Sequence, residues 1–86
     1  MELEARATDL LQRLIRHNTV NPPGNELAVQ TWLAGELTAA GFEVEMVAAD
    51  EQRPNLVATL RGDEPGPVLG LLSHVDTVLA EPERWT

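Results

Sequence analysis

The stretch VLGLLSHVDTV, residues 68–78, joins a run of apolar residues to two polar residues that carry chemistry. Residues 68–73 are apolar on both alternating faces, which is typical of an inner strand that is covered on both sides. His74 and Asp76 follow directly and share one face, while Val75 points to the other, because strand side chains alternate. The stretch therefore predicts a buried strand that ends on a histidine and a carboxylate.

His74 and Asp76 together are typical of half a metal site. Ligand sites in open α/β sheets collect at the carboxyl ends of strands. A neutral imidazole is a good zinc ligand, and a nearby carboxylate can accept the other ring N–H and orient the ring. A plainer interpretation stays open, in which the two side chains hydrogen-bond to each other or to loop backbone. One imidazole does not hold zinc alone, since such sites need three or four protein ligands.

Two helices are expected upstream of this stretch. Residues 3–17 carry an apolar stripe at helical spacing, and the paired prolines of HNTVNPPGN, residues 17–25, end that helix. His17 is expected to support its C-terminus. A second helix is predicted over residues 26–40, with Asn25 as its N-cap and Gly41 as its C-terminal glycine.

Three strands are expected after the helices. Phe42, Val44 and Met46 alternate with glutamates, which predicts a strand with one buried face. NLVATLR, residues 55–61, predicts a second strand, and residues 68–73 the third. The loop GDEPGP between the last two is too short for a helical crossover, so those strands would pair antiparallel.

This order of elements predicts an α/β fold. Two helices cover only one face of a sheet, whereas the third strand needs cover on both. We therefore expect a partial helix–sheet–helix sandwich, with two N-terminal helices and three strands of a larger mixed sheet.

Composition excludes several classes of function. The formal net charge is −8, from 14 acidic residues against six arginines, which argues against binding to nucleic acid. The absence of cysteine excludes disulfides and thiolate metal ligands. No apolar run is long enough to span a membrane, and the acidic N-terminus does not read as a secretory signal. A cytoplasmic location is the expectation. Glu81 and Glu83 are expected to be surface acids.

The whole chain resembles the N-terminal segment of the co-catalytic zinc amidohydrolases and peptidases. That family includes acetylornithine deacetylase, succinyl-diaminopimelate desuccinylase, aminoacylase and carboxypeptidase G. Three features carry the resemblance in the same order. These are the loop NTVNPPGNE after the first helix, the run LTAAGFEVEMV followed by NLVATLRG, and the site LGLLSHVDTV with Trp85 soon after it.

The resemblance implies a zinc-exopeptidase-like catalytic domain with a small inserted dimerisation domain, and hence a homodimer of the full-length protein. It implies two zinc ions, with cobalt or manganese as alternatives. It makes His74 a metal ligand and Asp76 the catalytic-site carboxylate that orients it. The implied reaction is hydrolysis of a small amide, such as an N-acyl amino acid or a short peptide, by a metal-bound water.

The sequence departs from the family pattern at three places. Ser73 replaces a frequent glycine, and Leu79 replaces the usual proline. The family's bridging aspartate, glutamate pair, later acidic ligand and final histidine would all lie beyond Thr86. We therefore expect residues 1–86 to be an incomplete, inactive N-terminal part of a metallohydrolase catalytic domain.

Two other interpretations remain open. In the first, the chain is a short non-catalytic α/β protein that uses its unfinished sheet for self-association or for binding a partner strand. It also fits a plain structural domain in which His74 and Asp76 only hydrogen-bond.

Overall fold

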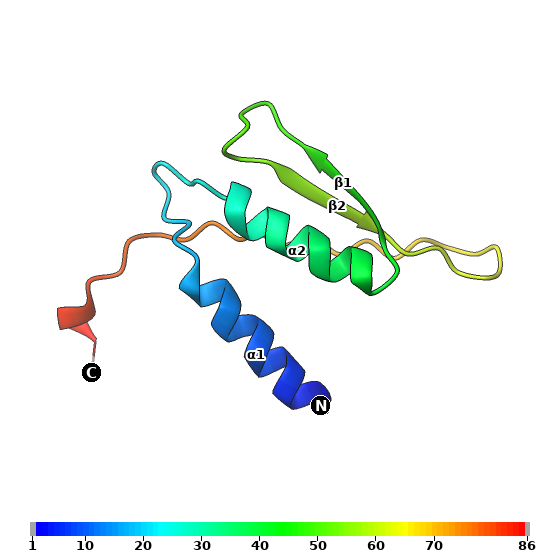
Figure 1. Cartoon of the computed structure of the whole chain (residues 1–86), viewed down its shortest axis with the longest axis horizontal. Helices are drawn as coiled ribbons and strands as arrows, with labels where there is room; N and C mark the ends of the chain where they lie inside the picture. The colour runs from blue at the N-terminus through cyan, green and yellow to red at the C-terminus, as the bar shows by residue number, and fades with distance from the viewer. Residues whose placement is uncertain (1, 86) are drawn as a thin grey trace.

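Two helices are followed by a β-hairpin in the computed structural model, which describes residues 2–85 (Figure 1). The predicted α/β class is confirmed. The elements, in chain order, are α1 (Leu3–Arg16), α2 (Leu27–Ala39), β1 (Glu43–Val47), β2 (Asn55–Thr59) and a short 3-10 helix, η1 (Pro82–Arg84).

Helix α1 ends at Arg16, one residue before the predicted end, and His17 is its C-cap. The backbone N–H of His17 donates to the carbonyl of Leu14 over 3.1 Å, and its ring Nδ1 lies 3.0 Å from the carbonyl oxygen of Arg13. The ring also stacks on Trp32 of α2, with 5.7 Å between ring centroids. His17 therefore supports the end of α1 and joins the two helices.

Helix α2 ends on the glycine that the sequence indicated. Gly41 has a φ of 98°, and its N–H donates to the carbonyl of Thr38 over 3.0 Å. The N–H of Phe42 reaches back to the carbonyl of Leu37, also over 3.0 Å. This pair of bonds is a Schellman motif, which requires the left-handed conformation that glycine adopts without strain.

The predicted N-cap of α2 is wrong. Asn25 does not cap the helix; Glu26 occupies the N-cap position, and no side chain there bonds to the first turn. Instead, the first N–H of the helix, that of Leu27, donates to the backbone oxygen of Gln52 over 3.2 Å. The loop between the strands thus satisfies a donor that local sequence left open.

Strands β1 and β2 form a two-stranded antiparallel sheet. Their register pairs Glu43 with Thr59 and Val47 with Asn55. The predicted alternation is confirmed in part: Val44 faces Ala58 across the ladder and both are half-buried, whereas Met46 is 37% exposed. Helix α2 packs against both strands and covers one face of the hairpin (Figure 1).

The predicted third strand is wrong. Residues 68–73 are not part of the sheet, and within residues 2–85 the sheet contains only β1 and β2. Val68, Leu69, Leu71 and Leu72 are 94%, 82%, 89% and 100% exposed. A strand needs a neighbour to complete its backbone hydrogen bonds, and no such neighbour lies beside this segment in the described chain. The predicted antiparallel pairing of the second and third strands is therefore wrong too. Of the helices in residues 2–85, α2 is the one that packs on the hairpin.

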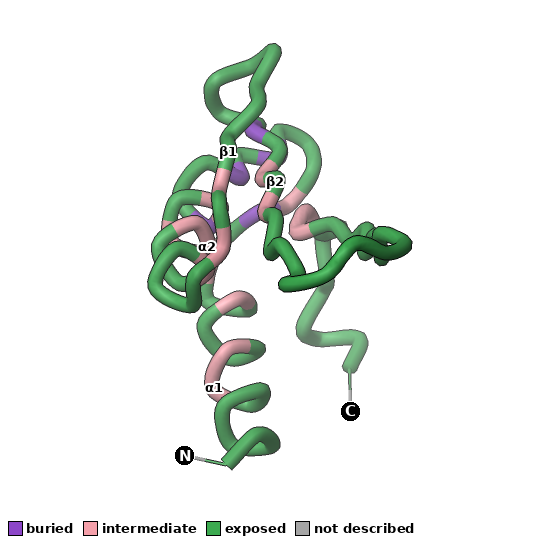
Figure 2. Tube along the Cα trace, turned by 90° about the vertical axis from the view of Figure 1, so that its right-hand side faces the viewer, coloured by how far each residue is buried: buried purple, intermediate pink, exposed green. Residues whose placement is uncertain are grey.

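The buried part of the molecule is small and lies at one end of α2. Figure 2 shows the buried positions gathered where the loop after α1, the start of α2 and the end of the β1–β2 loop meet. Val29 is the only buried large apolar side chain among the described residues. The buried residues are Thr19, Gly24, Glu26, Val29 and Pro54.

Residues 2–85 include no helix with both the length and the apolar character needed to cross a bilayer.

Candidate functional site

The segment that carries His74 and Asp76 is held by the loop after α1. Val20 and Thr77 form an isolated parallel bridge, in which Thr77 N–H donates to Thr19 O over 3.0 Å and Asn21 N–H donates to Thr77 O over 2.8 Å. The buried hydroxyl of Thr19 donates to the carbonyl of Val75 over 2.6 Å. These bonds fix residues 75–77 although they belong to no named strand.

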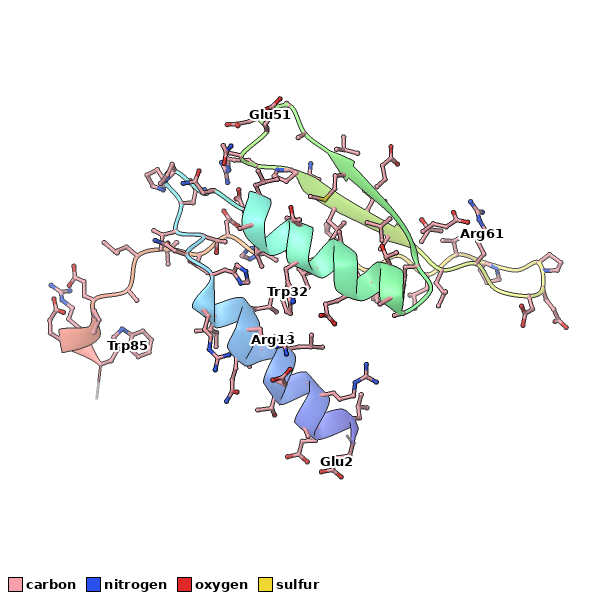
Figure 3. All side chains as sticks on the ribbon, viewed as in Figure 1. Glu2, Arg13, Trp32, Glu51, Arg61 and Trp85 are labelled. Atoms are coloured by element: carbon pink, nitrogen blue, oxygen red, sulfur yellow. The ribbon has the colours of Figure 1, made fainter. Side chains whose placement is uncertain are left out.

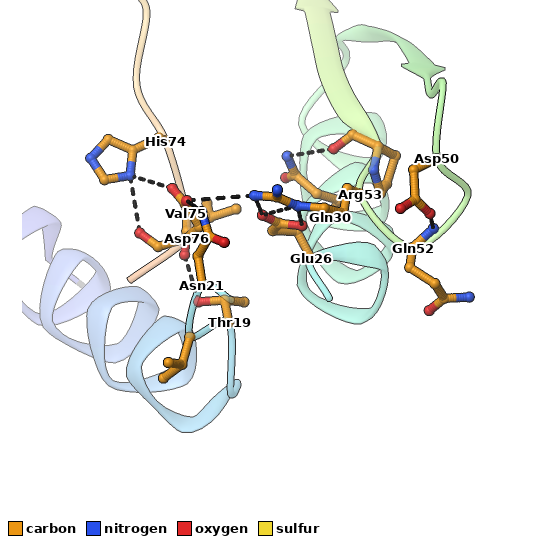
Figure 4. Close-up of polar contacts among 12 residues, drawn as sticks. Thr19, Asn21, Glu26, Gln30, Asp50, Gln52, Arg53, His74, Val75 and Asp76 are labelled. Carbon is orange, nitrogen blue, oxygen red and sulfur yellow. Dashed lines mark hydrogen bonds and ion pairs between the residues drawn. The ribbon is translucent and has the colours of Figure 1, made fainter. Parts of the chain in front are cut away.

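His74 and Asp76 are in direct contact (Figure 4). The ring Nδ1 lies 2.9 Å from Asp76 Oδ1 and 3.0 Å from the backbone oxygen of the same residue. Both partners are acceptors, so Nδ1 carries a proton, and a ring with this single proton presents the lone pair of Nε2. The side chain of His74 is 82% exposed, so Nε2 is accessible from outside.

The second oxygen of Asp76 has partners of its own. Oδ2 accepts a hydrogen bond from Asn21 Nδ2 over 3.1 Å and lies 3.6 Å from Arg53 Nη2. The hydrogen bond from Asn21 lowers the pKa of Asp76 most, against the opposing effect of burial, and the hydrogen bond from His74 and the positive charge of Arg53 lower it further. Asp76 is therefore held as a carboxylate that accepts on both oxygens.

Arg53 also pairs with Glu26, the N-cap residue of α2. Nη2 lies 2.8 Å from Oε1, and Nε contacts both carboxylate oxygens at 3.2 and 3.1 Å. Glu26 is only 7% exposed. The hydrogen bond from Arg53 lowers the pKa of Glu26 against the opposing effect of burial.

Sequence reasoning missed Asn21, Glu26 and Arg53 because each lies in or beside a segment that reads as a loop. Their partners are distant: 27 residues separate Glu26 from Arg53, and 55 separate Asn21 from Asp76. The one available signal was the pair of polar loops NPPGNE and DEQRPN, each of which contains groups that need a partner when buried.

A cleft of about 370 Å³ lies beside these groups. It opens between the start of α2, the end of the β1–β2 loop and the segment of His74 (Figure 4). Three carboxylates and one guanidinium face it, so its lining is net acidic. The residues that matter here are Glu26, Asp50, Arg53, His74 and Asp76.

The donor set fits one ligand of a metal ion and not a complete site. His74 presents an outward-facing Nε2, and its other ring nitrogen is held by a carboxylate, which is the usual support of a metal-binding imidazole. Within residues 2–85, no group of three or more histidines and acids is placed to hold a metal ion. Glu81 and Glu83 are exposed as expected, and Glu81 pairs with Arg84 over 2.7 Å. Metal binding at a closed site would require ligands from outside the described residues.

The chain is similar to two kinds of curated enzyme. It is 43% identical over 79 residues to succinyl-diaminopimelate desuccinylase of Xanthomonas oryzae pv. oryzae, a match that covers 91% of this chain and 20% of that protein. It is 32% identical over 80 residues to N-formyl-4-amino-5-aminomethyl-2-methylpyrimidine deformylase of Bacillus subtilis, which covers 88% of this chain and 19% of that protein.

The chain thus spans about a fifth of the length of the curated relatives it matches. No protein-family model matches the chain, and no solved structure matches it. Both relatives are named for removing an acyl group, formyl in one and succinyl in the other.

Proposed function

We propose that residues 1–86 form part of the catalytic domain of a metal-dependent hydrolase that removes a small acyl group from an amine nitrogen. The observation that carries the proposal is the His74–Asp76 contact of 2.9 Å, which leaves Nε2 accessible on the edge of a cleft. Similarity to a deformylase and a desuccinylase supports the reaction class.

His74 and Asp76 have separate roles in this proposal. His74 is a ligand of one metal ion through Nε2, and Asp76 accepts the Nδ1 proton and keeps the ring in the tautomer that ligation needs. Zinc, or cobalt or manganese in its place, would supply an activated water and would polarise the acyl carbonyl when bound. The remaining ligands and the general base come from outside these residues, so we propose that the 86-residue chain alone is inactive and that the complete protein acts on a small-molecule amide as a homodimer.

A chimera tests the proposal. The segment of the Xanthomonas desuccinylase that matches this chain is replaced by residues 1–86, and release of succinate from succinyl-diaminopimelate is measured with and without a chelator. We expect chelator-sensitive hydrolysis, which His74→Ala abolishes and Asp76→Ala reduces about 10–100-fold. His17→Ala is the matched control. His17 follows the last residue of α1 and stacks on Trp32, so this variant should retain hydrolysis. Hydrolysis that survives His74→Ala, or a folded chimera without hydrolysis, would overturn the proposal.

A second candidate function is favoured by the exposed apolar residues of segment 68–72. Such a segment offers backbone groups and apolar side chains to a second copy of the chain, by addition of a strand. Analytical ultracentrifugation of the isolated chain tests it. We expect species larger than the 9.4 kDa monomer, and we expect Leu72→Asp to return the chain to a monomer. Leu3→Asp places the same charge on another exposed leucine and should change nothing. A monomer at all concentrations would exclude self-association.

A further inference from the structure

We propose that Arg53 is a positioning residue for the His74–Asp76 pair. Glu26 holds its guanidinium on one side and Gly24 makes room for it on another, so that Arg53 and Asn21 occupy one oxygen of Asp76 and leave the other for His74. A catalytic role for this positioning rests on the proposed function. The contacts among Glu26, Arg53, Asp76 and His74 do not depend on that function.

The anchor of the arrangement is the Glu26–Arg53 ion pair. Glu26 is almost fully buried, and a buried carboxylate is costly unless it is paired and hydrogen-bonded. Three contacts of 2.8–3.2 Å from one guanidinium meet that need. Because Nε and Nη2 are both engaged, the plane and direction of the guanidinium are fixed, which a single contact would not achieve.

The fixed guanidinium then acts on Asp76. Nη2, which contacts Glu26, also faces Asp76 Oδ2 at 3.6 Å, and Asn21 donates to the same oxygen (Figure 4). With positive charge and an amide donor on Oδ2, the carboxylate plane is set and Oδ1 is directed to His74 Nδ1. Arg53 therefore contributes, together with Asn21, to the ring orientation through Asp76, without contacting the ring.

Gly24 lies directly beside the guanidinium of Arg53 and leaves space for it. A Cβ at residue 24 would collide with the guanidinium, reaching Cζ at 2.8 Å and Nη2 at 2.9 Å as well as Nε. Gly24 also has a φ of 102°, which side chains rarely adopt. Gly41 has a similar φ of 98° but has open space where its Cβ would lie. A side chain at residue 24 would therefore displace the guanidinium of Arg53, whereas one at residue 41 would displace nothing.

The test reads the tautomer of His74 directly, by long-range ¹H–¹⁵N NMR of the ring nitrogens in the 86-residue chain at a pH where the rings are neutral. The chain has two histidines, and both bond an acceptor through Nδ1. We expect both to be Nδ1–H tautomers. Arg53→Gln should convert His74 to a mixture of tautomers and leave His17 unchanged, because His17 packs on α1 and Trp32.

Glycine variants separate positioning from general destabilisation. Gly24→Ala should disturb His74 as Arg53→Gln does, whereas Gly41→Ala carries the same backbone strain and should not. The proposal is overturned if His74 keeps its tautomer in both Arg53→Gln and Gly24→Ala, if wild-type His74 is not an Nδ1–H tautomer, or if His17 and His74 change together, which would make Arg53 a general structural residue.

Zinc addition distinguishes this inference from the proposed function. Zinc added to the desuccinylase chimera, which supplies the remaining ligands, should perturb Nε2 of His74 if His74 is a ligand. No perturbation, with the tautomer still dependent on Arg53, would contradict ligation and leave positioning intact. If zinc perturbs Nε2 but the tautomer of His74 is the same in wild type and Arg53→Gln, ligation is supported and positioning by Arg53 is contradicted.

Discussion

At the scale of single residues, the site consists of short polar side chains whose partners lie far away in sequence. Spacing in the sequence placed His74 and Asp76 on one side of the chain, and their contact is present. The same reasoning did not find Asn21, Glu26 or Arg53, because hydrogen bonds between loops have no periodicity. At this scale, the sequence predicts the contact between His74 and Asp76 but not the distant residues that hold Asp76 in place.

The buried carboxylate of Glu26 predicts a pH dependence of stability. Its pKa is lowered below the ordinary value of 4.5 in the folded chain. The unfolded state therefore takes up the proton first as pH falls, and the free energy of unfolding declines from about that pH downward. Chemical denaturation between neutral and acid pH should show this decline, and Glu26→Gln should make it shallower.

Glu43→Gln is the matched control for this measurement. Glu43 also faces an arginine, Arg61, but at 3.4 Å and with both side chains largely exposed, so its ion pair contributes little. An unchanged acid dependence in Glu26→Gln, or an equal change in Glu43→Gln, would contradict the assignment to the buried pair.

At the scale of elements, the success of each prediction depended on whether the determining contacts are local. The apolar spacing of α1, the glycine that ends α2 and the apolar–polar alternation of β1 are properties of neighbouring residues, and the two helices and the strand that they predict are present. The prediction of Asn25 as the N-cap failed because the backbone oxygen of Gln52, in another loop, accepts from the first N–H of α2. Segment 68–73 failed because apolar, extended sequence becomes a strand only beside another strand.

Alanine should change the free energy of unfolding in opposite directions at Gly41, which ends α2, and at Gly35, which lies inside it. Gly41→Ala forces a side chain into the left-handed region and should lower the free energy of unfolding by about 1 kcal/mol. Gly35 lies inside α2 with open space around it, so Gly35→Ala should raise it by up to about 1 kcal/mol. Urea denaturation followed by circular dichroism measures both, and shifts of the same sign would be inconsistent with the Schellman end.

At the scale of the whole molecule, the chain is more extended than its length requires. Its radius of gyration is 15.3 Å, against about 12 Å for a compact domain of 86 residues. Figure 3 shows many side chains directed away from the ribbon into open space, Trp85 and Arg61 among them. The curated relatives that the chain matches are about five times longer.

Stability should therefore depend on very few buried groups. Val29→Ala removes the one large apolar side chain that is fully buried among residues 2–85 and should cost about 2 kcal/mol. Leu11→Ala removes a side chain that is 57% exposed and should cost much less. Thermal melts of the two variants give the comparison; similar losses would mean that burial around Val29 is not what stabilises the chain.

The isolated chain should also unfold over a broad temperature range. So little apolar surface is buried that α1 and the hairpin have few shared contacts to couple their unfolding. Circular dichroism at a helix-sensitive wavelength and tryptophan fluorescence should give separate transitions. Coincident, sharp transitions from both probes in a monomeric sample would contradict this.

The bridge between Val20 and Thr77 has a consequence for the order of folding. Each helix and the hairpin close over short stretches of chain and can form within microseconds. The bridge closes a loop of more than fifty residues, which costs chain entropy before any bond at the bridge is gained. Thr77 and Asn21 should thus be among the last amides to gain protection from hydrogen exchange and among the first to lose it. The residues proposed for chemistry are assembled only once the rest of the chain is in place.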